Sequence, residues 1–161
     1  MISTRRHLQY ASGHIELGMF QEAAAELAAI RPSDQLLPEV IGVRIDLHMQ
    51  AKHWQTVLQL AQDFIRFSPD DEKGWISRAY ALRELELIEE AQAVLLEAEP
   101  LHGEKCGVLH YNLACYACLL GNKIEAKRRL AIAIKLDKAW KQSALDDPDL
   151  KAMRSVIVAM K

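Results

Sequence analysis

Small and apolar side chains recur along this chain at intervals of about 34 residues. Stepping back 35, 34 and 34 residues from Ala114 gives Ala79, Ile45 and Ala11. Three further columns at the same steps also hold only small or apolar residues: Ala126, Ala91, Val57 and Ala23; Leu130, Leu95, Ala61 and Leu27; Ala133, Ala98, Phe64 and Ile30. Chance rarely fills so many places in register when half the chain is apolar. The pattern indicates four copies of one unit.

The spacing inside each copy predicts two helices. In the fourth copy the first helix carries Ala114 and Ala117, and the second carries Ala126, Leu130 and Ala133. Steps of three and four residues place side chains on one helical face. No segment alternates with a period of two in the manner of a β-strand, so we expect an all-α solenoid of about four helix–turn–helix repeats.

The boundaries of the copies follow from turn residues. We place the copies at residues 4–37, 38–71, 72–105 and 107–140 of a single domain, 1–161. Gly18 and Gly121 separate first from second helices, where a positive φ is needed. Pro32, Pro69 and Pro100 are expected to follow the ends of second helices, because proline cannot continue a helix.

A last helix is expected after the fourth copy. Asp147 is a good N-cap and Pro148 suits the first turn, so the sequence predicts a helix over 148–160. One face of this helix would carry Leu150, Met153, Ile157 and Met160. Because a solenoid must cover its last apolar surface, we interpret residues 141–161 as a C-terminal cap.

The repeat resembles the tetratricopeptide repeat (TPR), a unit of about 34 residues. The residues that carry the resemblance are Trp75 with Ala79, Leu113-Ala114, the turn glycines Gly18 and Gly121, the pairs Glu22-Ala23, Glu90-Ala91 and Glu125-Ala126, and Pro69. It covers about residues 4–140. The resemblance implies a right-handed α-solenoid whose first helices line a concave groove that binds a protein partner.

The columns offset from the buried positions identify the groove-facing residues that this resemblance implies. They are Leu8, Ser12, Ile15, Asp46, Met49, Lys73, Ile76, Tyr80, Arg83, Tyr111, Cys115 and Cys118. We therefore predict a non-enzymatic scaffold, a monomer or weak homodimer, that holds a peptide or helix of a partner protein. A clamp for a C-terminal carboxylate is not expected, since only Lys73 fits one. The alternatives are a chaperone of secretion substrates, similar to the type III class, and self-assembly through the C-terminal helix.

Composition excludes several classes of function. A formal charge of −2 and a pI near 6.3 give no general attraction to nucleic acid or to an anionic membrane. No apolar run approaches the roughly 18–20 residues that span a bilayer. The N-terminus does not resemble a signal peptide, and three cysteines fit a reducing compartment. We therefore expect a cytoplasmic protein with no nucleic-acid or membrane partner.

Candidate chemistry is sparse. Cys106, His110, Cys115 and Cys118 have the residue types of a zinc site, but the Cys115–Cys118 pair falls in mid-helix, so groove or core positions are favoured. Asp146, Asp147 and Asp149 are better explained by helix capping than by a cation. No nucleophile elbow and no glycine-rich phosphate loop occurs. We expect no catalytic residue, cofactor or metal.

Two further patterns recur between copies. His14 and His48 occupy the same slot, which indicates packed rings or, alternatively, a pH-sensitive pair. The third copy is rich in glutamate, whereas residues 123–141 are rich in lysine and arginine. We expect these charges to complement one another on solvated helix faces, each pair contributing roughly 0–1 kcal/mol.

Overall fold

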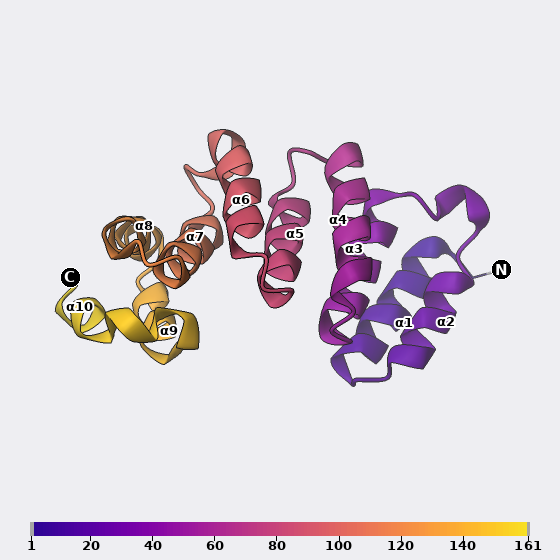
Figure 1. Cartoon of the computed structure of the whole chain (residues 1–161). Coiled ribbons are helices and arrows are strands. Elements are labelled where there is room, and N and C mark those ends of the chain that lie inside the picture. The colour runs from indigo at the N-terminus through magenta and orange to yellow at the C-terminus, as the bar shows by residue number, and fades with distance from the viewer. Residues whose placement is uncertain (1, 161) are drawn as a thin grey trace. The chain divides into compact units, whose positions relative to one another are not determined.

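The computed structural model describes residues 2–160, and every regular element in that range is helical (Figure 1). The α-helices and 3-10 helices are α1 (Thr4–Glu16), α2 (Phe20–Ala28), η1 (Pro32–Asp34), α3 (Pro38–Gln50), α4 (Trp54–Phe67), α5 (Glu72–Glu84), α6 (Ile88–His102), α7 (Gly107–Leu119), α8 (Lys123–Leu136), α9 (Ala139–Asp146), η2 (Pro148–Met153) and α10 (Arg154–Ala159). The all-α prediction is confirmed.

These elements form two compact units, Met1–Ala81 and Leu82–Lys161. In the first unit α1 contacts α2 and α3, and α3 contacts α4. In the second unit α7 contacts α6, α8 and η2, while α9 contacts α8, η2 and α10. The boundary between the units falls inside α5.

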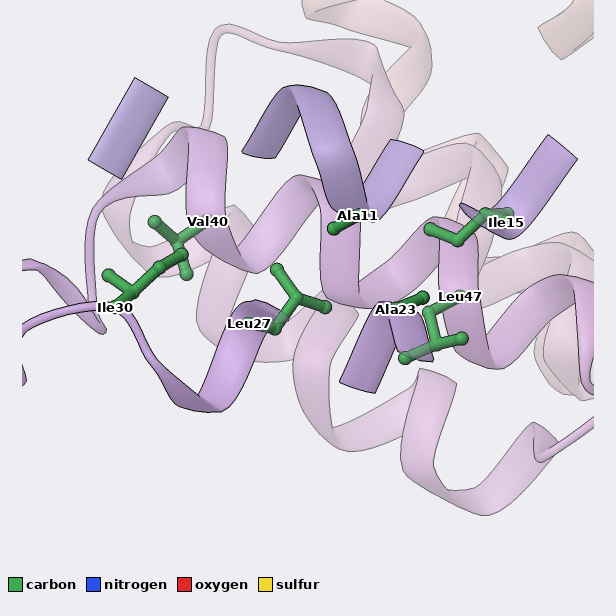
Figure 2. Packing of buried hydrophobic residues seen from close by; sticks show 7 residues of the cluster. All are labelled: Ala11, Ile15, Ala23, Leu27, Ile30, Val40 and Leu47. Carbon is green, nitrogen blue, oxygen red and sulfur yellow. The ribbon is translucent and has the colours of Figure 1, made fainter. Parts of the chain in front are cut away.

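The four apolar columns of the sequence form the interiors of the helix pairs. None of the sixteen column residues is more than 3% exposed, and most are fully buried. Small side chains at these places let two helices approach closely, which is why alanine recurs there. In the first unit one core cluster consists of Ala11, Ile15, Ala23, Leu27, Ile30, Val40 and Leu47 (Figure 2). A second cluster joins Ile41, Ile45, Val57, Ala61, Phe64 and Ala81.

Each helix pair is closed by the same turn. Met19, His53, Leu87 and Asn122 donate their backbone N–H groups at 2.8–2.9 Å to carbonyls five residues earlier, those of His14, His48, Leu82 and Ala117. This is the 6→1 bond of a Schellman motif, which needs one residue with positive φ. Gly18 (φ 72°) and Gly121 (φ 81°) supply it in the first and fourth turns. Lys52 (φ 58°) and Glu86 (φ 64°) supply it in the other two, although neither is glycine.

We expect Lys52→Gly to raise the free energy of unfolding by roughly 0.5–1 kcal/mol. A Cβ is strained in the left-handed region, and glycine removes that strain at some cost in unfolded-chain entropy. Urea unfolding of the variant measures the change. Lys52→Ala is the control, because it removes the same long side chain but keeps the Cβ. Equal effects of the two substitutions would contradict the explanation from backbone strain.

The structure differs from the sequence prediction in two places. Pro100 does not follow α6 but lies in its last turn, because α6 continues to His102 and ends before Gly103. The single helix predicted over 148–160 is wrong. A helix that the sequence did not predict, α9, precedes it, and the predicted stretch is divided into the 3-10 helix η2 and the short α10. Asp147 does cap this stretch, since its side chain accepts the N–H of Asp149 at 2.9 Å.

Candidate binding surfaces

The first helix of the N-terminal unit borders an open hollow of about 700 Å³. Its lining includes two of the predicted groove residues, Leu8 and Ser12, both partly exposed on α1. Arg5 of α1 and Glu39 of α3 also line it, and Leu37 borders it before α3. The hollow thus offers apolar surface flanked by one positive charge, Arg5, and two negative charges, Glu16 and Glu39.

Further predicted groove residues of this unit lie on α3 and α5. Lys73 Nζ lies 2.6 Å from Asp46 Oδ1, and both side chains are partly exposed. The stem of Lys73 lies over Gly42 of α3, where a Cβ would meet Lys73 Cε at 3.6 Å. Met49 and Ile76 are half-buried.

Tyr80 is the exposed aromatic of this face. Its side chain is 39% exposed, and its ring lies against Trp54 with the centroids 5.8 Å apart. An aromatic ring held in this way offers contact area with little rotamer entropy left to lose. Ile15 differs from the other predicted groove residues of this unit, because it is buried in the first core cluster and presents nothing to a partner.

In the C-terminal unit the corresponding face is covered by the chain itself. Tyr111, Cys115 and Cys118 of α7 are only 7%, 4% and 7% exposed. The Tyr111 hydroxyl donates to Asp147 Oδ2 at 2.7 Å, and its ring stacks on Trp140 with a centroid distance of 4.6 Å. These three side chains therefore form the floor under α9 and η2 rather than an open groove.

Arg83, at the end of α5, is bound to the same segment. Its Nε donates to Asp149 Oδ2 at 2.8 Å, and a second guanidinium nitrogen donates to Asp149 Oδ1. Leu150, Met153 and Ile157 beyond it are almost completely buried. The apolar face predicted for the last helix thus packs within its own unit, which fits a cap.

Burial decides the protonation of the groups under this segment. Burial first, and then the charges of Asp147 and Asp149, raise the pKa of the Cys115 thiol far above its ordinary value. Burial also raises the pKa of Cys118, and burial with the hydrogen bond to Asp147 raises that of Tyr111. Both thiols are therefore neutral at physiological pH and lack the thiolate character of a nucleophile.

Cys115, Asp147 and Asp149 lie close enough to suggest a metal site, with ligand atoms within 4.8 Å of one another. The carboxylate oxygens are already engaged. Asp147 accepts from Tyr111 and from the Asp149 backbone, and Asp149 is bound by Arg83. The charge of Arg83 and the protonated thiol both oppose a cation here, so the donor set does not fit a metal. His110 of the other candidate set donates Nε2–H to the Gly103 carbonyl at 2.7 Å instead.

An ion network centred on one buried arginine holds the helices of the C-terminal unit together. Arg129 of α8 is 4% exposed, and it donates through Nε to Glu125 at 2.6 Å and through Nη2 to Glu99 of α6 at 3.0 Å. Its Nη1 also lies 3.3 Å from His110 Nδ1. Because a guanidinium can only donate, His110 Nδ1 is the acceptor in this contact, while Nε2–H donates to the Gly103 carbonyl. The charge complementarity expected on solvated faces is therefore partly internal.

His14 and His48, which share one slot of the repeat, lie in different environments. His14 is half-buried near the end of α1. His48 Nδ1 lies 3.1 Å from His53 Nδ1 across the second turn, and burial followed by the charges of His53 and Arg44 lowers the pKa of His48. The neighbour of His48 in the structure is thus His53 and not a histidine of another copy.

Comparison with solved structures identifies the architecture. The structure matches TTC0263, a thermophilic TPR protein of Thermus thermophilus, with a TM-score of 0.71 at 16% identity, over 97% of this chain and 99% of that one. The chain has the tetratricopeptide-repeat fold. It also matches MamA AMB-1 with a TM-score of 0.65 at 13% identity, over 94% of this chain and 92% of that one.

No family model matches the sequence, and no curated protein matches it. The TPR fold is thus evident in the structure and in the repeat pattern but not in overall sequence similarity. Within residues 2–160, no helix combines the length and apolar character that crossing a membrane demands.

Proposed function

We propose that this TPR-fold chain is a non-enzymatic scaffold that binds a peptide or helix of a partner protein on the first-helix face of its N-terminal unit. The observation that carries the proposal is the hollow of about 700 Å³ beside α1, lined by Leu8 and Ser12. Apolar surface beside a few polar groups is the usual composition of a peptide-binding groove.

Exposed and half-buried side chains on α3 and α5 support the same face. Met49, Ile76 and Tyr80 supply apolar and aromatic surface, and the Asp46–Lys73 pair supplies charge of both signs. Tyrosine is enriched among the residues that dominate binding energy in interfaces. The face is therefore suited to an amphipathic segment, with an apolar stripe over Leu8, Ile76 and Tyr80 and polar groups toward Lys73.

The test begins with a peptide selected from a displayed library against the full chain. Tyr80→Ala is expected to weaken its binding at least about tenfold, since a central aromatic contact is worth more than about 1.4 kcal/mol. Leu8→Asp, at the edge of the hollow, is expected to weaken binding as well. Isothermal titration measures both, and circular dichroism confirms that the variants are folded.

Phe67→Ala provides the matched control. Phe67 is also an exposed aromatic of the N-terminal unit, 46% exposed, but it lies at the end of a second helix, α4. We expect no change in affinity for this variant. A peptide that loses affinity through Phe67 and keeps it through Tyr80 binds the second-helix face, and the proposal would then be wrong.

A further inference from the structure

The segment from Asp147 to Leu150 lies on α7 as a bound peptide lies on a receptor. Asp147 accepts the Tyr111 hydroxyl, and Asp149 is bound through both carboxylate oxygens by the guanidinium of Arg83. Leu150 follows directly and is fully buried. Two anionic anchors and one aliphatic anchor thus occupy four consecutive residues.

The receptor side of this contact is built from first-helix positions. Tyr111, Cys115 and Cys118 were predicted from their columns to face a partner, and Arg83 was predicted likewise at the end of α5. The structure shows them facing a segment of the same chain. The contact is selective for acidic residues, because an arginine fork binds a carboxylate in two parallel hydrogen bonds and an amide cannot accept both. Asp147 is likewise matched to a hydroxyl donor.

We propose that this face is a binding site for a short acidic segment of the Asp-x-Asp-Leu type in a partner protein, and that the chain's own residues 147–150 fill it until such a segment competes. The site lies wholly within the C-terminal unit. It does not depend on the function proposed for the N-terminal unit, so either proposal can fail alone.

Competition of this kind has a definite concentration scale. A ligand tethered by a short linker acts at an effective concentration of about millimolar. A free segment with the same contacts therefore displaces about half of the tethered one when it is also about millimolar. A partner that acts at lower concentration must add contacts outside Asp147–Leu150.

The test uses the full chain and a synthetic peptide of its residues 144–153, ALDDPDLKAM. At about millimolar peptide, we expect hydrogen exchange at the amides of Leu150–Ile157 to become at least tenfold faster, with α8 unchanged. The matched control is the same peptide with Asp147→Asn and Asp149→Asn, which should have no effect. If the parent peptide leaves the exchange rates unchanged, the segment is a permanent cap and the proposal is overturned. Equal acceleration by both peptides would also overturn it.

Arg83→Ala in the full chain tests whether the ion pair with Asp149, rather than non-specific apolar packing, holds the segment in place. We expect its Leu150–Ile157 amides to exchange at least tenfold faster without peptide, while α8 amides keep the protection of the parent chain. Exchange in this segment identical to the parent's would overturn the proposal. Light scattering tests a further possible ligand, a second copy of this chain. If the parent chain becomes a dimer with exchanged C-terminal segments, the ligand is a second copy and the assignment to a partner protein is wrong.

Discussion

Replacing Arg129 with alanine is expected to lower the free energy of unfolding by about 3 kcal/mol, the low end of the loss on breaking a buried ion pair, because its carboxylate partners are partly exposed. The Arg129 guanidinium is 4% exposed and bonds Glu99 of α6 and Glu125 of α8. Without it, the Glu99 carboxylate and the His110 Nδ1 acceptor lose their donor, and Glu125 keeps only its bonds from Arg128. Urea unfolding followed by circular dichroism measures the loss.

The adjacent residue supplies the control. Arg128 donates to the same carboxylate, Glu125, at 2.6–2.7 Å, but its side chain is 54% exposed. Exposed pairs contribute roughly 0–1 kcal/mol, so Arg128→Ala should change stability by no more than that. If the two arginine variants were equally stable, burial would not be what makes the Arg129 network important.

Acid should remove the contribution of Arg129. Hydrogen bonding to Arg129 lowers the pKa of Glu99 below its ordinary 4.5, and hydrogen bonds from Arg128 and then Arg129 lower that of Glu125 to about 2. A lowered pKa stabilises the fold above the ordinary value, and the effect is lost as pH falls toward the folded-state value. The parent chain should therefore lose its advantage over Arg129→Ala as the pH drops below about 4.5. An advantage that stays constant down to about pH 2–3 would contradict this account.

Tyr111→Ala is expected to cost about 3–5 kcal/mol, the usual range for deleting a buried aromatic side chain. Its ring stacks on Trp140, and its hydroxyl is the donor to Asp147. Tyr111→Phe keeps the stacking and loses only the hydrogen bond to a carboxylate, so about 1.5–3 kcal/mol is expected. Thermal and urea unfolding of the two variants measure both values.

Tyr80→Ala is the comparison at an exposed position of the other unit. It should change stability by about 1 kcal/mol or less, because the ring is 39% exposed and leaves no closed cavity. Comparable losses for Tyr80 and Tyr111 would mean that Tyr111 is not covered in solution as it is in the structure. From the sequence alone, both tyrosines would have been judged suitable for mutation without loss of stability.

The repeat was predictable because its signal is spread over many positions. Ala11, Ile45, Ala79 and Ala114 are separated by nearly constant steps, and all four are fully buried. Each column samples the same helix–helix contact, so exceptions at one place do not obscure the others. Even the two turns without glycine keep their places, because Lys52 and Glu86 adopt the positive φ that glycine adopts in the other two.

The packing of α9 and η2 over α7 was not predictable from the same reasoning. Columns report contacts that recur in every copy, whereas α9 and η2 occur once. They contact α7 and α8 of the last copy, and Asp149 of η2 also binds Arg83 of the third copy. Trp140 was placed at the end of the fourth repeat, with nothing to mark it as the partner of Tyr111. The Asp147 N-cap was recognised, but capping explained the aspartates locally and concealed the long-range bond from Asp149 to Arg83.

Arg129 shows a third limit. The sequence showed an acidic copy followed by a basic one, and the structure pairs Glu99 with Arg129 between them. Which arginine is buried depends on helical phase. Arg128 and Arg129 are adjacent, yet one points outward and the other toward α6 and α7. Charge composition identified the right helices, but not the residue whose removal should matter most.

The segment over α7 also controls the access of oxidants to the thiols of Cys115 and Cys118. Cys115 and Cys118 are buried and protonated while Asp147–Asp149 is in place, and oxidation requires an accessible thiolate. Their oxidation is therefore governed by the fraction of time the segment is open rather than by intrinsic thiol chemistry. A partner that displaced Asp147–Leu150 and left part of α7 uncovered would couple its binding to the redox sensitivity of the chain.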